Sequence, residues 1–220
     1  MSRSRYILLV VVCMACAMAS AQQRLRRPEM YVGVHGGVMA STVYFNPSVS
    51  NMDLLQSPLS ANGGLVFRYA GHKVCAIQLE ANYMQRGWRE VGGGVDYRRQ
   101  LDYIEVPMLM HLYFGGKHFR AFFNLGPQLG YCIRDVQYGN SNPNYKHQYA
   151  KIDNAFDWGA AAGLGVLYRT NKIGVFQLEA RFNYSLGGVF NASKMDHFQT
   201  ASHMNVSLNL AYLWELRIKN

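Results

Sequence analysis

Three glutamates and three arginines have the side-chain types needed to carry protons or ions through a protein. They are Glu80, Glu105, Glu179, Arg68, Arg120 and Arg181. Each lies in a segment that alternates between apolar and polar residues, and each falls in the phase of the polar face. Gathered in one enclosed space, these groups could form a proton path or a small-solute pore. Alternatively, they could pair with one another as a plug, because buried charges need partners.

A second group of residues could form a hydrolase site. Ser202 and His203 with Asp196, or Ser185 with Glu179, supply a nucleophile together with a base or an acid. Neighbouring residues of a strand face opposite sides, so Ser202 and His203 cannot pair without a bulge. The sequence also lacks the Gly-x-Ser-x-Gly elbow of many hydrolases. We therefore expect no catalytic residues.

Two cysteines, Cys75 and Cys132, follow the N-terminal segment. In strand phase Cys75 shares a face with Ile77 and Leu79, whereas Cys132 falls on the other face and near the opposite end of its strand. A disulfide requires Cα atoms within about 7 Å of each other, so we predict two free thiols. No cluster of Cys or His has the spacing of metal ligands. We expect neither a metal site nor a cofactor.

Strands must position these side chains, and the segment Leu101–Phe114 shows their pattern. Its even-numbered residues are apolar except for Asp102, and its odd-numbered residues include Glu105 and His111. At 14 residues the segment is long for a soluble domain. It suits a tilted membrane crossing, which needs about 9–11 residues plus rims. Pro107 lacks an N–H group, so we expect a bulge or strained pairing there.

The chain divides into eight segments of this kind. They are Met30–Tyr44, Ala61–Ala70, Val74–Trp88, Arg98–Phe114, Phe119–Arg134, Trp158–Arg169, Ile173–Gly187 and Thr200–Leu216. Their connections alternate between long and short, as in outer-membrane barrels with brief periplasmic turns and longer outer loops. We predict an all-β fold over residues 22–220. It is an eight-stranded antiparallel transmembrane β-barrel with an up-and-down meander and both termini in the periplasm.

The lysines indicate which face of the barrel is inside. A soluble lipocalin-like barrel would show the same alternation, with its apolar face inward, and would carry lysine on its outer strand faces. Here all seven lysines lie in predicted turns, loops or the C-terminal tail: Lys73, Lys117, Lys146, Lys151, Lys172, Lys194 and Lys219. This distribution favours a membrane barrel whose apolar face contacts lipid. Eight strands enclose a lumen that side chains can just fill, so a ladder of paired Glu and Arg is favoured over a pore.

Residues 1–21 have the features of a secretory signal: a positive start, an apolar run and the small residues Ala19-Ser20-Ala21. A lipoprotein anchored through Cys16 is the alternative. The formal net charge of +9 could suggest nucleic acid, but an exported chain rarely meets any. Lipid phosphates and solvated loops are simpler partners for the basic residues. We therefore expect a location in the outer membrane, membrane lipid as a partner and no nucleic acid.

The segment Asp135–Asp153 is the candidate for contact with a protein partner. It contains Tyr138, Tyr145, Lys146 and Tyr149 among several asparagines. Loops rich in Tyr, Asn and Ser supply an adaptable recognition surface. A merely solvated, mobile loop would explain the same composition equally well.

Four segments carry a resemblance to a known family. The most specific is Tyr103–Leu109, YIEVPML, and the others are Gly126–Gly130 (GPQLG), Phe156–Gly159 (FDWG) and Leu178–Gly187 (LEARFNYSLG). The first is similar to a Y-[LI]-E-[VI]-P-L-L strand, with Met108 for Leu. The last is similar to L-E-x-R-Y-x-Y-G-L, with Phe182 for Tyr and Ser185 for Gly. These motifs resemble those of the PorT-like outer-membrane β-barrel proteins of the Bacteroidetes.

This resemblance covers essentially the whole chain after the signal segment. It implies an eight-stranded barrel in the outer membrane. The namesake of the family takes part in the type IX secretion system, whereas most members have no assigned role. The resemblance thus implies a non-enzymatic structural or interaction component, accessory to protein secretion and with secretion-machinery proteins as partners. A narrow pore for small solutes and, less favoured, a lipid-active enzyme are the alternatives.

Overall fold

The computed structural model describes residues 24–46, 53–56, 59–92, 95–140, 155–170, 173–186 and 200–216. In these ranges no helix is long and apolar enough to cross a membrane. The signal segment predicted over residues 1–21 lies outside the described residues, as do Tyr145, Lys146 and Tyr149.

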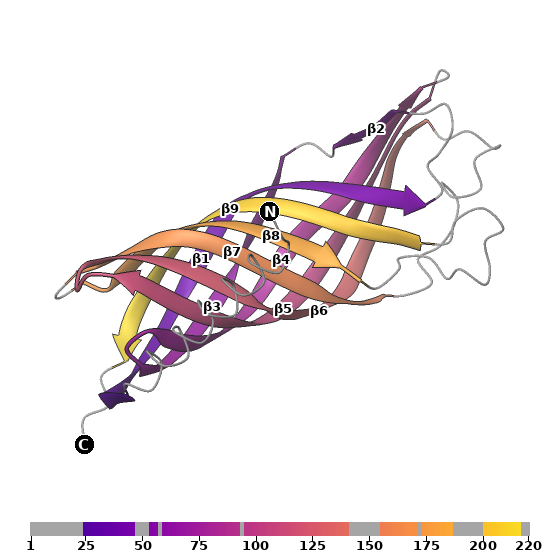
Figure 1. The fold of residues 1–220 in the computed structure, drawn as a ribbon. Coiled ribbons are helices and arrows are strands. Elements are labelled where there is room, and N and C mark those ends of the chain that lie inside the picture. Colours follow the sequence, from indigo (N-terminus) through magenta and orange to yellow (C-terminus); the bar gives the residue numbers. More distant parts are fainter. Residues whose placement is uncertain are drawn as a thin grey trace, which may run out of the picture.

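The described strands form one antiparallel sheet that closes into a barrel (Figure 1). They are β1 (Arg24–Asn46), β2 (Asp53–Gln56), β3 (Ser60–His72), β4 (Cys75–Gly92), β5 (Val95–Gly115), β6 (Phe119–Asn140), β7 (Phe156–Arg169), β8 (Val175–Ser185) and β9 (Thr200–Leu216). β1 and β3 to β9 each pair with the next strand of this set, and β9 pairs with β1. The short β2 pairs only with β4. The predicted eight-stranded, up-and-down antiparallel barrel is confirmed.

The two ends of the barrel differ. At the end that we call the turn end, short connections join β3 to β4, β5 to β6 and β7 to β8. Gly115 and Gly174 there have φ values of 127° and 136°, which side chains other than glycine rarely adopt. β1 begins and β9 ends at the same end, where Met30 pairs with Leu216. We call the opposite end the loop end.

At the loop end β4, β5 and β6 extend beyond the other strands (Figure 1). β5 and β6 pair as far as Asp96 and Asn140, and β2 adds to the edge of β4. Tyr138, predicted to lie in a loop, therefore lies in β6. That prediction was wrong because strand pairing continues past the apolar belt, where the sequence turns polar. The guanidinium carbon of Arg98 lies 5.8 Å from the centroid of the Tyr138 ring, which is a cation–π contact.

Of the bulge or strained pairing expected at Pro107, the bulge does not form, but the ladder with β4 is interrupted there: Met108 pairs with Leu79 and Glu105 with Asn82, with no pair between them. β5 keeps one register with β4 on both sides of this residue, and Pro107 pairs with Gln128 of β6. A missing N–H group removes one hydrogen bond of the ladder without requiring an extra residue in the strand. The register shift between β5 and β6 lies instead at Asp102 and Tyr103. Beyond this shift the two strands continue toward the loop end, past the exposed apolar side chains of the outer wall.

The faces of the barrel are reversed relative to a soluble barrel. Large apolar side chains on the outer face are exposed, to 61% for Leu65 and 68% for Leu210. On the inner face Arg68 is 1% exposed and Glu105 0%. In water, exposed apolar area would cost about 25 cal/mol per Å², whereas lipid covers it at no such cost. The membrane barrel inferred from the lysine positions is confirmed.

The cysteines also lie as predicted. Cys75 and Cys132 are both free. Cys75 pairs with Leu112 near the turn end, and Cys132 pairs with Tyr103 nearer the loop end. The two thiols are therefore far apart along the barrel axis.

An apolar cluster fills the lumen near the turn end. It consists of nine buried residues: Tyr31, Val66, Ala70, Ala76, Tyr113, Phe122, Leu167, Val175 and Leu213. We call this cluster the apolar layer. It separates the turn end from the polar middle of the lumen, where the candidate site lies.

Candidate functional site

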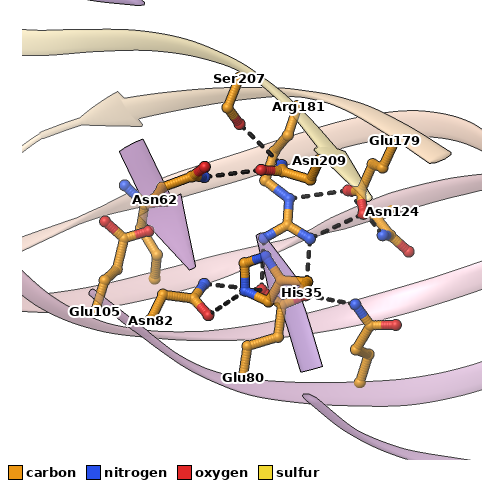
Figure 2. Close-up of polar contacts among 12 residues, drawn as sticks. His35, Asn62, Glu80, Asn82, Glu105, Asn124, Glu179, Arg181, Ser207 and Asn209 are labelled. Atoms are coloured by element: carbon orange, nitrogen blue, oxygen red, sulfur yellow. Dashed lines mark hydrogen bonds and ion pairs between the residues drawn. The ribbon is translucent and has the colours of Figure 1, made fainter. Parts of the chain in front are cut away.

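The centre of the lumen holds an arginine between two glutamates (Figure 2). Arg181 of β8 donates to both carboxylate oxygens of Glu80 on β4, at 2.6 and 2.7 Å. It also donates to Glu179, at 2.9 Å from Nε and 3.0 Å from Nη2. All three side chains are buried. Bidentate pairing uses the planar guanidinium group well, and its strength rises where water is excluded.

A second arginine reaches the same carboxylates through two glutamines. Arg68 of β3 donates to Oε1 of Gln78, at 2.8 Å from Nε, and to Oε1 of Gln177. Gln78 in turn donates to Glu80. Gln177 donates to Glu179 at 3.0 Å. Two arginines thus balance two glutamates, and we call this set the central cluster: Arg68, Glu80, Glu179 and Arg181.

Histidine and asparagine side chains surround the central cluster (Figure 2). Nε2 of His35 lies 2.7 Å from Oδ1 of Asn82 and 3.8 Å from Oε2 of Glu80. Asn124 donates to Glu179 at 3.0 Å. The cavity left among these side chains measures about 10 Å³, which is room for about one water molecule.

Closer to the loop end, one arginine holds two carboxylates from other strands. Arg86 of β4 donates to Asp157 of β7 at 2.6 Å and to Glu105 of β5. The ring of Tyr103 lies 4.7 Å from its guanidinium carbon, a cation–π contact. Ser185 donates to Asp157 and accepts from Arg86. One arginine faces two carboxylates, so the formal charge is −1 in this loop-side cluster of Arg86, Glu105 and Asp157.

The four motif segments, Tyr103–Leu109, Gly126–Gly130, Phe156–Gly159 and Leu178–Gly187, meet at the loop-side cluster. Asn183 donates to Glu105 at 3.0 Å and to Gln128 at 2.7 Å. Each segment supplies at least one side chain to this contact set: Tyr103, Glu105, Gln128, Asp157, Asn183 and Ser185. Residues of these four motifs therefore assemble one buried site from β5, β6, β7 and β8.

The six charged residues predicted for the interior occupy three places. Four form the central cluster, and Glu105 belongs to the loop-side cluster. Arg120 lies at the turn end, where its Nε donates to the backbone oxygen of Gly116 at 2.9 Å. Its guanidinium group lies over the ring of Tyr113 at 5.4 Å. The strand phase of Arg120 is correct, but phase carries no information about depth, and the apolar layer separates Arg120 from both clusters.

Three members of the site were not singled out from the sequence: Arg86, Asp157 and His35. Each falls in the polar phase of its strand, so the alternation that selected Glu80 could have found them. The pairing of Arg86 with Asp157 has no sequence signal, because the two residues are 71 positions apart and meet only when the barrel closes.

Neither hydrolase set is assembled among the described residues. Ser185 is buried and bonds to Asp157 and Arg86 rather than to Glu179. Ser202 and His203 occupy adjacent positions of β9. Asp196 lies outside the described residues.

Comparisons with known proteins agree with the barrel. A family model described as "Outer membrane protein beta-barrel domain" matches residues 20–191. The outer membrane protein OprG of Pseudomonas aeruginosa is similar in structure, with a TM-score of 0.51 and 15% identity over 87% of this chain and 97% of that chain. Ail, the attachment invasion locus protein of Yersinia pestis, has a TM-score of 0.45 and 14% identity over 84% and 99%.

A comparison with curated proteins found no match. At 15% identity the similarity to OprG shows the fold alone, whereas the family model spans most of the sequence. The chain therefore belongs to the outer membrane protein beta-barrel domain family and is an outer-membrane β-barrel protein.

Proposed function

We propose that this barrel is a closed, non-enzymatic structural or interaction component of the outer membrane, accessory to protein secretion. The proposal rests on the observation that side chains fill the lumen. The apolar layer, the central cluster and the loop-side cluster follow one another along the barrel axis, and the cavity in the central cluster measures about 10 Å³. A barrel that passes no solute acts through its two ends and its outer wall.

The proposed orientation places the turn end in the periplasm. Short connections are typical of the periplasmic side of outer-membrane barrels. Both described chain ends, Arg24 and Leu216, lie at the turn end, where a chain cleaved after residue 21 would emerge. Exposed aromatic residues stand on the outer wall toward both ends, as interfacial girdles do: Tyr69, Tyr168 and Trp214 toward the turn end, Tyr83, Tyr131 and Trp158 toward the loop end. They support membrane lipid as a partner.

The secretion role rests on the resemblance to the PorT-like proteins, whose motifs build the loop-side cluster. That cluster fixes β4, β5 and β7 just below the extension of β4, β5 and β6. On this extension Tyr138 is 48% exposed. We propose that a secretion-machinery protein contacts Tyr138 together with Tyr145, Lys146 and Tyr149, which follow it in the chain.

Deletion of the gene in the native host tests the secretion role. We expect cargo proteins that normally reach the cell surface to accumulate in the periplasm, and the wild-type gene to restore export. A gene that encodes Tyr138→Ser, Tyr145→Ser, Lys146→Ser and Tyr149→Ser should fail to restore export. A matched gene with R89Q and D96N, which alters the same end of the barrel, should restore it. Normal cargo export in the deletion strain would reject the role.

Single-channel recording tests the closed lumen separately. We expect no steady conductance from the purified barrel in a planar bilayer, because ion pairs and the apolar layer occupy the lumen. Reproducible steady conductance would favour a narrow pore instead.

A further inference from the structure

A recess opens at the turn end, on the far side of the apolar layer from both charged clusters. Its volume is about 430 Å³, within the range of small-ligand pockets, about 300–1,000 Å³. Ala70 and Tyr113 line it and also belong to the apolar layer. The recess is therefore a dead end, suited to holding a ligand and not to passing one. We call it the turn-end recess.

The recess carries an excess of positive charge. Its lining includes one carboxylate, Glu29, and four basic side chains: Lys73, Lys117, Arg120 and Arg169. Arg169 pairs with two carboxylates, Glu29 at 2.9 Å and Glu215 at 3.0 Å, so these three residues together carry a formal charge of −1. Lys73, Lys117 and Arg120 make no ion pair with any described residue. Three cations without an ion-pair partner thus share one concave space, and with the set of Arg169, Glu29 and Glu215 the net formal charge is +2.

One of these cations is held in position. Arg120 donates its Nε to the backbone oxygen of Gly116 and lies over the ring of Tyr113. Its two terminal nitrogens make no hydrogen bond to a described residue, and they remain available to a ligand. The lining also includes His72, whose Nδ1 is buried and has no hydrogen-bond partner in the described part of the chain. A fixed guanidinium group loses little side-chain entropy on binding.

We infer that the turn-end recess binds a phosphate group. A guanidinium fork and two lysines that line the same recess suit a tetrahedral anion with several acceptor oxygens. A net charge of +2 can be neutralised by a phosphate monoester, and a phosphodiester offers one negative charge with more acceptor oxygens than a single carboxylate. The phosphate could belong to a soluble compound or to the headgroup of a phospholipid at the rim, where Lys73 and Lys117 are exposed. The inference goes beyond the proposed function and holds whichever side of the membrane the turn end faces.

Calorimetric titration of the folded full-length barrel with inorganic pyrophosphate tests the site. The titration uses a maltoside detergent, which contains no phosphate. We expect saturable binding, with an affinity that falls about tenfold in R120Q and further in K73Q/K117Q/R120Q. The matched control is R134Q, which removes one exposed cation at the loop end and should leave the affinity unchanged. Different migration of unboiled and boiled samples on a detergent gel confirms that each variant is folded.

A second experiment distinguishes the two sources of phosphate. Wild-type and triple-variant barrels are extracted from vesicles of phosphatidylcholine and phosphatidylglycerol, and the retained lipid is measured by mass spectrometry. Pyrophosphate binding lost in the triple variant supports a soluble phosphate ligand. Phosphatidylglycerol retained only by the wild type supports a headgroup. The inference is overturned if neither ligand responds to the triple variant, if R134Q weakens binding equally, or if hexaglutamate binds and pyrophosphate does not.

Discussion

The central cluster and the loop-side cluster neutralise buried charge in different ways. In the central cluster two arginines face two glutamates, and neighbours two positions apart on one strand support them: Gln78 donates to Glu80, and Gln177 donates to Glu179. In the loop-side cluster a single arginine, Arg86, faces two carboxylates. The hydrogen bonds of Arg86, Asn183 and Ser185 to Glu105 and Asp157 in this second cluster join different strands.

The difference shows how much redundancy each cluster has. If Arg181 is lost, Arg68 still reaches both glutamates through the glutamines. If Arg86 is lost, Glu105 and Asp157 have no other described cation within ion-pair distance. We therefore expect the loop-side cluster to be the more sensitive to substitution, although it contains fewer charged residues.

The largest effect is expected for Arg86→Met. It leaves two carboxylates buried without a cation, and we expect the free energy of unfolding to fall by about 5 kcal/mol, the upper end for a broken buried pair. Urea unfolding of the barrel in lipid vesicles, followed by the gel shift of unboiled samples, measures it. A smaller loss than in Arg181→Met would break the comparison between the clusters.

Arg181→Met should lower the free energy of unfolding by less, about 3 kcal/mol, because Arg68 remains near both glutamates. The same urea titration measures it. The double variant Arg68→Met/Arg181→Met sharpens the point, since its loss should exceed the sum of the two single losses by about 1 kcal/mol or more. Strict additivity would show that Arg68 does not compensate.

Glu105→Ala should have an intermediate effect, about 1–3 kcal/mol, because Arg86 keeps Asp157 as a partner while Asn183 loses an acceptor. We expect a lower melting temperature and an unchanged absence of steady ion conductance. Thermal melting by circular dichroism and planar-bilayer recording measure the two properties. Conductance that appears in the variant would mean that Glu105 closes the lumen as well as stabilising it.

Arg169→Gln should have the smallest effect, about 1 kcal/mol or less. This residue pairs with Glu29 and Glu215 at the turn end, where its side chain is 26% exposed and water screens the pair. Urea unfolding again provides the measurement. A loss as large as that of Arg181→Met would show that ion pairs outside the lumen matter as much as those within it.

The barrel fold and its outward apolar face could be predicted from the sequence, because both depend on local patterns within each strand. The alternation in Leu101–Phe114 and the absence of lysine from the predicted strands are enough to place apolar side chains outward. The extension of β6 through Tyr138 could not be predicted, because there backbone pairing, rather than apolar burial, maintains the strand. At Pro107 the missing N–H suggested a bulge or strained pairing; the ladder with β4 is interrupted there, while the register on both sides is the same.

The candidate site shows the same division. Strand phase alone placed Glu80, Glu179 and Arg181 on the inner face, and the same phase applies to Arg86. Partner choice and depth are set by closure of the barrel. The position of Arg120 beyond the apolar layer and the pairing of Arg86 with Asp157 could therefore not be read from the sequence.

The distances along the chain between paired lumen residues also have a consequence for folding. Glu80 and Arg181 are 101 positions apart, and Asn62 and Asn209 are 147 apart. Contacts between residues so far apart in the chain form late and slow folding, because the loop-closure entropy is lost before the contacts stabilise the fold. A partly assembled sheet would expose unpaired glutamates and arginines to the hydrocarbon core. Insertion of this chain into the membrane should therefore be cooperative. We expect β1 and β9 to pair in the same step in which the charged residues of the lumen pair with one another.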